Sequence, residues 1–157
     1  MSKNLVEIKG FSELQRKLKT LGNDKIKRRE MLKVLGQVAN PTVKAARGQA
    51  PISKRSHVQS GKRSRKVIQP GNLKKSIGKI TGRRGLGKRN AVLYVGPKSK
   101  GRKNDGWYAK FVQHGTVKQT ANPFMKRAYQ QTKGGVTADA EVKVARYMQK
   151  QIDRLSK

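Results

Sequence analysis

The chain has 157 residues and a formal net charge of +31, from 39 Lys and Arg residues against 8 Asp and Glu residues. Only 34% of its residues are apolar, so we expect a small core and, because of the charge, a polyanionic or acidic partner. The absence of cysteine excludes disulfides and thiolate metal sites. No apolar run is long enough to span a membrane, and residues 1–5 do not resemble a signal peptide. We therefore expect synthesis and action in a cytoplasm.

Helical patterns dominate the N-terminal third of the chain. Residues 5–10 alternate weakly between apolar and polar and predict a short strand, and residues 12–22 predict a helix. A longer helix is predicted from Asp24 to Ala50-Pro51, with a kink or break at Pro41. Its apolar face consists of Met31, Leu32, Leu35, Val38, Ala39, Val43 and Ala46.

The middle of the chain predicts strands joined by basic connections. Residues 52–71 are rich in Lys, Arg, Ser and Gly and predict a long loop. Three strand-like segments follow at 73–81, 91–95 and 107–113, and turn residues separate them. This order is typical of an antiparallel meander. We therefore expect an α+β fold in which an antiparallel sheet of three to four strands packs against the N-terminal helices, with C-terminal helices.

Two helices are predicted near the C-terminus. Pro123–Gln131 predicts a short helix, and Gly134-Gly135 separates it from a final helix that begins near Thr137. The final helix has a narrow apolar seam of Ala145, Met148, Ile152 and Leu155. That width favours docking onto the domain or onto a neighbouring subunit. We expect residues 1–136 to form the α+β domain and residues 137–157 a C-terminal helix.

Positive charge is concentrated in three predicted connections, and no acidic residue occurs between Glu30 and Asp105. Solvated loops usually mix charges of both signs, so this run favours contact with phosphate groups or with an acidic protein. Phosphate contacts of this kind carry no sequence specificity. The candidate contact residues are Lys54, Arg55, Lys62, Arg63, Arg65, Lys66, Arg83, Arg84, Lys88, Arg89, Lys98, Lys100, Arg102 and Lys103.

Few residues are suited to catalysis. His57 lies in the basic loop, and His114 precedes Gly115 at a predicted turn. The acidic residues have no spacing that suggests general acid–base chemistry, and the sequence contains no metal-ligand cluster or phosphate-binding glycine motif. We therefore expect a protein that is not an enzyme, with no catalytic residue, no metal and no cofactor.

Residues 107–128 read WYAKFVQHGTVKQTANPFMKRA. Within them, the pattern Tyr-Ala-x-Phe-Val-Gln-x-Gly-Thr is followed by Ala-x-Pro-Phe-Met-x-x-Ala. Together with Ala50-Pro51, residues 71–77 and residues 92–96, in that order, this pattern resembles the tail-completion (head–tail joining) proteins of long-tailed bacteriophages. The resemblance covers roughly residues 5–130. Two features depart from it: the family usually has Glu where this chain has Gln113, and residues 51–71 are longer and more basic than the pattern needs.

The resemblance implies a structural protein of the phage neck, assembled in the host cytoplasm as a homo-oligomeric, hexameric ring around the DNA path. It implies head-connector, tail-terminator or tail-tube proteins as partners, with packaged DNA held by nonspecific phosphate contacts and no membrane. The motif residues would serve the fold or subunit contacts: Tyr108, Phe111, Gly115, Thr116, Pro123, Phe124 and Met125. Of these, Phe124 and Met125 are predicted core residues.

The composition alone also fits a second class of protein, a sequence-nonspecific nucleic-acid-binding module such as a chromatin-like or ribosome-associated protein. Trp107 and Tyr108 could stack on bases in such a protein. Their position in an apolar, strand-like pattern favours core packing instead.

Overall fold

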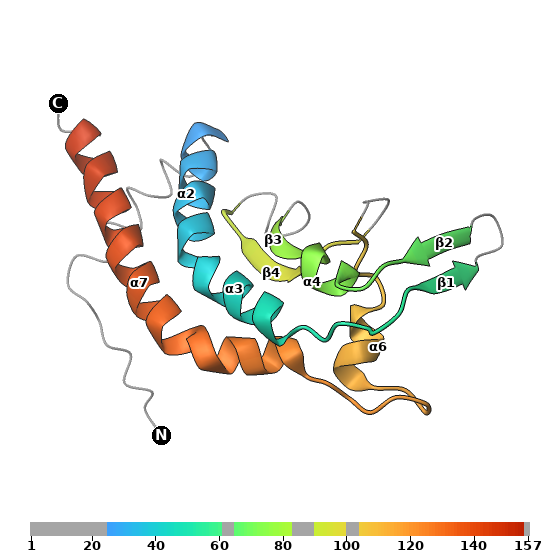
Figure 1. The fold of residues 1–157 in the computed structure, drawn as a ribbon. Helices are drawn as coiled ribbons and strands as arrows, with labels where there is room; N and C mark the ends of the chain where they lie inside the picture. Colours follow the sequence, from blue (N-terminus) through green and yellow to red (C-terminus); the bar gives the residue numbers. More distant parts are fainter. Residues whose placement is uncertain (1–24, 61–64, 83–89, 100–103, 156–157) are drawn as a thin grey trace, which may run out of the picture.

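The longer helices form one side of the molecule, and the short strands lie on the other side together with shorter helices (Figure 1). The computed structural model describes residues 25–60, 65–82, 90–99 and 104–155. The longest helix, α7 (Phe124–Leu155), packs along α3 (Asn40–Gln49) and α2 (Lys25–Val38). The strand predicted at 5–10 and the helix predicted at 12–22 lie outside the described residues.

The break predicted at Pro41 is confirmed, because α2 ends at Val38 and α3 begins at Asn40. Proline has no N–H for the carbonyl of the residue four positions earlier, so a continuous helical ladder cannot pass through Pro41. The helices still face inward as predicted. The buried apolar residues of the two helices are Val38, Ala39, Val43, Ala46 and, just after α3, Ala50.

Two antiparallel pairs of strands occur in the described part of the chain. β3 (Ile77–Thr81) pairs with β4 (Leu93–Pro97), with Ile77 opposite Pro97 and Thr81 opposite Leu93. β1 (His57–Ser60) pairs with β2 (Arg65–Ile68). The fold is therefore α+β as predicted, but the described sheets have two strands each rather than three to four.

The β1–β2 hairpin lies within residues 52–71, which were predicted to be a long loop. The hairpin extends away from the helices, at the end of the molecule opposite the C-terminus (Figure 1). The strand predicted at 73–81 is also only half correct, because it begins as a short helix, α4 (Asn72–Ser76). Leu73, Ser76 and Ile77 are all buried, and their spacing places them on one helical face.

The strand predicted at 107–113 is wrong, since this segment forms the helix α6 (Ala109–His114) after a turn. A short apolar run fits both periods, and here the three-residue spacing of Ala109 and Val112 decides the outcome. Both side chains are buried, whereas Phe111, which the strand pattern would have placed beside Ala109, is exposed. The motif therefore supplies a helix to the core.

The two helices predicted on either side of Gly134-Gly135 form one continuous helix, α7. Both glycines are exposed, and neither has a neighbouring atom within 4 Å of a Cβ built on it. Packing of α7 on α2 and α3 outweighs the low helix propensity of glycine. In the predicted seam, Met148 and Ile152 are half-buried, whereas Ala145 is exposed.

The core is small and lies where α3, α4, β3, α6 and α7 meet. Its largest fully buried side chains are Phe124 and Ile77, so Phe124 is a core residue as predicted. Met125 is half-buried and packs against this cluster together with Tyr108. The remaining buried members are Ala46, Ala50, Leu73, Ala109, Val112 and Ala128.

Candidate interaction surface

The motif segment forms a closed structural unit from α6 to the start of α7. Gly115 ends α6 with φ of 79°, a conformation that residues with a side chain rarely adopt. A Cβ at this position would lie 2.8 Å from the backbone nitrogen of Ala121 and 2.8 Å from the carbonyl oxygen of Gln119. Thr116 and Gln119 exchange backbone hydrogen bonds of 2.8 and 3.1 Å, which closes the loop. Glycine at 115 is therefore required by the loop.

Gln113 caps the beginning of α7. Its Oε1 accepts a hydrogen bond of 3.2 Å from the backbone N–H of Met125, one of the donors that a helix N-terminus leaves without an internal partner. The side chain of Asn122, which precedes Pro123, accepts a 2.6 Å hydrogen bond at Oδ1 from Nη2 of Arg127. The position at which this chain departs from the family pattern thus has a structural role that the sequence analysis did not assign.

Four aromatic side chains form a cluster at the base of the β1–β2 hairpin, which we call the aromatic patch: His57, Trp107, Tyr108 and Phe111. The ring centroids of Trp107 lie 6.0 Å from Tyr108 and 5.8 Å from Phe111, both edge to face. His57 meets Tyr108 edge to face at 6.5 Å. These distances are typical of favourable aromatic pairs.

The aromatic patch is only partly covered. Trp107 is 41% exposed and Phe111 40%, so the core role favoured for Trp107 is wrong, while Tyr108 is half-buried. Asn72 donates a 3.2 Å hydrogen bond to the hydroxyl of Tyr108, which fixes that ring. Lys110 places its Nζ 5.0 Å from the centroid of the Phe111 ring, within the range of a cation–π contact.

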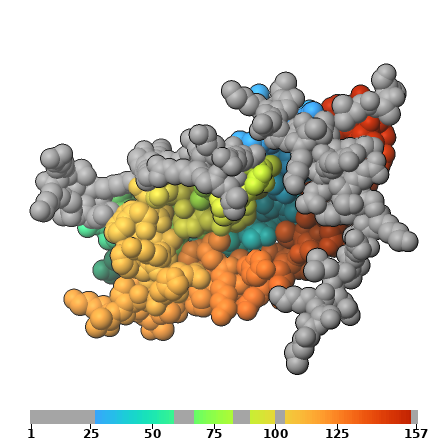
Figure 2. All heavy atoms as spheres, turned by 180° about the vertical axis from the view of Figure 1, so that it is seen from behind, coloured from blue at the N-terminus to red at the C-terminus, as the bar shows by residue number. Residues whose placement is uncertain are grey.

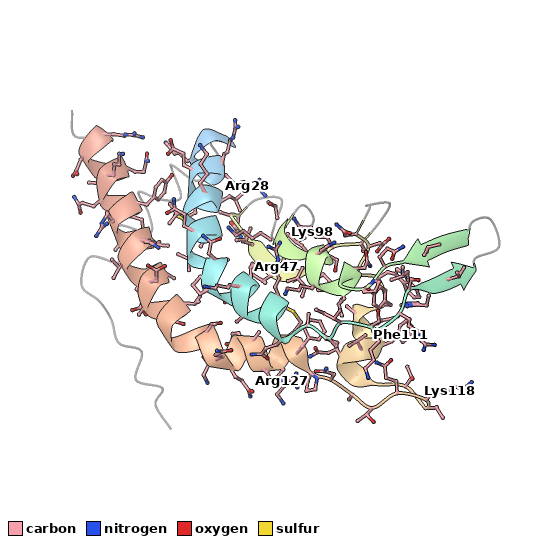
Figure 3. The ribbon with its side chains drawn as sticks, viewed as in Figure 1. Arg28, Arg47, Lys98, Phe111, Lys118 and Arg127 are labelled. Carbon is pink, nitrogen blue, oxygen red and sulfur yellow. The ribbon has the colours of Figure 1, made fainter. Side chains whose placement is uncertain are left out.

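Exposed aliphatic side chains surround the aromatic patch. Val58 and Val67 face each other across the β1–β2 hairpin and are 48% and 52% exposed. Ile52 is exposed just before the hairpin, and Val117 is fully exposed beside Lys118, which Figure 3 shows at the tip of the loop after α6. A protruding hairpin with two exposed valines, together with exposed aromatic rings, offers apolar area for a protein contact.

Three of the fourteen predicted cationic contacts have described side chains: Lys54 and Arg55 are exposed and Lys98 is half-buried. Lys54 and Arg55 lie just before β1. Lys98 follows β4, and its N–H bonds to the carbonyl of Ser76 at 2.9 Å. Arg65 and Lys66 lie on β2, with only their backbone described, and the remaining nine lie outside the described residues: Lys62, Arg63, Arg83, Arg84, Lys88, Arg89, Lys100, Arg102 and Lys103.

Two arginine side chains bind backbone carbonyls within the molecule, a role that the sequence did not reveal. Arg28 on α2 binds the carbonyl oxygens of Gly82 and Asn90, at 2.8 and 3.2 Å, and so holds both ends of the β3–β4 connection. Arg47 on α3 donates from Nε and Nη2 to the carbonyl oxygen of Ile77, at 3.0 and 2.8 Å. Figure 3 shows both arginines between their helices and the strands.

Acidic residues are segregated to one end of the molecule. We call α2 together with residues 139–155 of α7 the helical end, and the other described residues the body. Asp105 is the only acidic residue between Glu30 and Asp139 in the sequence. In the body, Oδ1 of Asp105 accepts a hydrogen bond from the N–H of Trp107 at 3.0 Å.

Glu30 and Asp139 of the helical end have partners within it. Glu30 accepts hydrogen bonds from Gln151 at 3.1 Å and Tyr147 at 3.4 Å, and lies 3.9 Å from Arg154. Asp139 pairs with Lys143 at 2.7 Å. These ion pairs belong to the helical end, and the body has one acid among its described residues, so that acid alone cannot balance the cations of the body.

The described residues contain no group of three or more His, Cys, Asp or Glu side chains that could hold a metal ion. None of the described helices is both long and apolar enough to cross a membrane. Comparison of the chain with protein-family models, curated proteins and solved structures gave no match.

Proposed function

We propose that this chain is a structural protein of a phage neck, which completes the tail and joins it to the DNA-filled head as a homo-oligomeric, hexameric ring around the DNA path. The resemblance of residues 107–128 to tail-completion proteins supports the family. The tight packing of those same residues into one α6–loop–α7 unit supports a shared scaffold. A structural protein of this kind needs rigid packing and contact surfaces, and no catalytic group.

The observation that carries the proposal is the separation of charge within the molecule. The body has a single acidic residue, Asp105, whereas the other described acids lie in the helical end. A ring around packaged DNA would tolerate or attract the phosphate backbone through such a body. The aromatic patch and the exposed Val58–Val67 pair are the surfaces that we assign to contacts between subunits or with neck proteins.

Mass measurement by light scattering, coupled to size exclusion at high salt, tests the assembly. High salt weakens association that is mediated by bound polyanions. A discrete oligomer at high salt therefore reflects contacts between protein subunits. The proposal predicts either a closed oligomer or a monomer that assembles on purified tail tubes. A chain that stays monomeric with tail tubes and with head connectors, yet binds duplex DNA tightly, would contradict it.

A sequence-nonspecific nucleic-acid-binding module is the second candidate, and the exposure of Trp107 and Phe111 beside Lys110 favours it specifically. Exposed rings next to cations are the stacking platforms of single-strand binders. In that case Trp107→Ala should weaken binding of a single-stranded oligonucleotide by about 1–3 kcal/mol. Under the neck proposal, the same substitution should weaken assembly and leave salt-dependent DNA binding nearly unchanged.

A further inference from the structure

In the described part of the chain, no strand pairs with the outer edge of β4. The bonds from Gly82 N–H to Val92 and from Lys98 N–H to Ser76 set the alternation of this antiparallel ladder. Tyr94 and Gly96 accordingly direct their backbone groups toward β3, whereas Leu93 and Val95 direct theirs outward. No backbone hydrogen bond to Leu93 or Val95 is made by the described residues. By contrast, Arg47 covers the outer edge of β3 at Ile77.

An apolar groove follows this unpaired edge. A cleft of about 460 Å³ is lined by Leu93, Tyr94 and Val95 of β4, by residues of α2 and α3, and by residues of α7. A second cleft of about 340 Å³ shares Val95 and Met125 with the first and continues past Pro97 to α6. Figure 2 shows atoms of α3 between those of β4 and those of α7, at the bottom of the groove. The residues contributed by the helices are Leu35, Val38, Ala39, Thr42, Met125, Tyr129, Val136 and Ala140.

The groove therefore offers what an added β-strand requires. Outward backbone groups of β4 supply hydrogen bonds, and the helices supply an apolar surface for every second side chain. An exposed strand edge beside apolar side chains is a liability for aggregation unless something covers it.

The N-terminal segment of the chain has the matching pattern. Residues 5–8 read Leu-Val-Glu-Ile, so an extended conformation places Val6 and Ile8 on one face and Glu7 on the other. Among residues 1–24 this is the segment that the sequence predicts to be a strand. Glu7 would point out of the groove, toward a body with a single acidic residue.

The chain before Lys25 is also long enough for residues 5–8 to reach the groove. At 1.5 Å per residue, Leu35 lies about 15 Å along α2 from Lys25. The helix predicted over residues 12–22 spans about 16 Å at the same rise. If that helix runs back along α2, the chain returns to the level of Leu35, beside the groove. A segment tethered so closely has a high effective concentration there, which favours the same chain over a second copy.

We propose that residues 5–8 of the same chain bind in this groove as a third strand on the edge of β4, with Val6 and Ile8 against α2 and α3. The strand covers the edge and extends the small core. This assignment does not depend on the neck role.

Hydrogen–deuterium exchange resolved at single amides tests the proposal on the full chain. The amides of Leu93 and Val95 should exchange at least about tenfold more slowly in the full chain than in V6D/I8D, which keeps the chain length and removes the apolar face. Glu7→Gln, on the opposite face, should leave that protection unchanged. The amides of Tyr94 and Gly96, bonded to β3, should stay protected in all variants and report that the fold is retained.

Equal exchange of Leu93 and Val95 in the full chain and in V6D/I8D, with Tyr94 and Gly96 still protected, would overturn the proposal. Light scattering on the same samples distinguishes a strand supplied by the same chain from a strand supplied by a second copy. Protection that is independent of concentration supports the intramolecular strand. Protection that appears only as the measured mass increases places the segment of a second copy in the groove and contradicts the assignment.

Discussion

The helical end and the body of this molecule balance their charges in different ways. In the helical end, Glu30 accepts hydrogen bonds from Tyr147 and Gln151 and lies near Arg154, and Asp139 pairs with Lys143, so both signs of charge occur there and some are paired. In the body, Arg47 binds a backbone carbonyl, and Asp105 is the only acid; Arg28 reaches from α2 to two further carbonyls of the body. A region that keeps one sign of charge while the neighbouring helices mix both is what the proposed polyanionic partner requires.

The two regions also differ in what holds them together. The body has the aliphatic and aromatic core around Phe124, whereas the helical end relies on long polar side chains between α2 and α7. Buried apolar contacts are worth several kcal/mol each, and exposed ion pairs are worth little. Substitutions in the body should therefore change stability most, and substitutions in the helical end least.

The largest effect is expected for Phe124→Ala. This ring is fully buried, so its removal should lower the free energy of unfolding by about 3–5 kcal/mol. Urea denaturation followed by circular dichroism measures this change. Phe111→Ala is the matched control, since its ring is 40% exposed, and it should cost much less. Equal losses for the two variants would show that the core does not centre on Phe124.

Gly115→Ala should be the next most harmful change. The positive φ and the contacts of 2.8 Å with Ala121 and Gln119 predict a loss of about 1–3 kcal/mol. Gly134→Ala should instead stabilise the protein by about 0.8–1 kcal/mol, because Gly134 lies within α7 with open space around it. Thermal midpoints of the two variants should move in opposite directions. A loss of stability in Gly134→Ala would contradict a continuous α7.

The cap of α7 should have a smaller effect. Gln113→Ala removes the acceptor for the N–H of Met125 and should cost about 0.5–2 kcal/mol, as other helix caps do. Gln113→Glu, which introduces the residue usual in the family that the sequence resembles, should stabilise the helix by about 0.3–1 kcal/mol because a negative charge is favourable at a helix N-terminus. A higher denaturation midpoint for Gln113→Ala than for the wild type would contradict a capping role for Gln113.

Glu30→Gln is expected to change stability least. The carboxylate is 3.9 Å from Arg154, and both side chains are partly exposed, so solvent screening reduces the ion pair to less than about 1 kcal/mol. Glutamine can still accept from Gln151. Calorimetry at low and high salt checks this, and a loss comparable to that of Phe124→Ala would reverse the ranking of the two regions.

The sequence identified the core and the break between the first helices more accurately than the strands. Phe124, Pro41 and the apolar face of α2 and α3 followed from residue type and helical spacing. The segment 107–113 did not, because six or seven residues with mixed apolar spacing fit both a strand and a helix. Only the packing of Ala109 and Val112 against the core selects the helix.

The sequence predicted which kinds of residue form the candidate surface, but it did not predict where they lie in the fold. The single sign of charge between Glu30 and Asp105 was visible in the sequence. The aromatic patch was not, because it joins His57 of the hairpin to residues about fifty positions away, and such contacts depend on tertiary structure. The roles of Arg28 and Arg47 as ligands of strand carbonyls were hidden for the same reason.

The central claim is that cations outside the helical end, and not those within it, bind the polyanion. The most direct measurement is the salt dependence of duplex DNA binding for two variants with four charges removed. R83Q/R84Q/K88Q/R89Q should reduce the slope of log affinity against log salt by about 3–4, since each phosphate contact contributes about 0.9. K143Q/R146Q/K150Q/R154Q should change that slope much less. Equal reductions in the two variants, or an unchanged slope in the first, would contradict the claim.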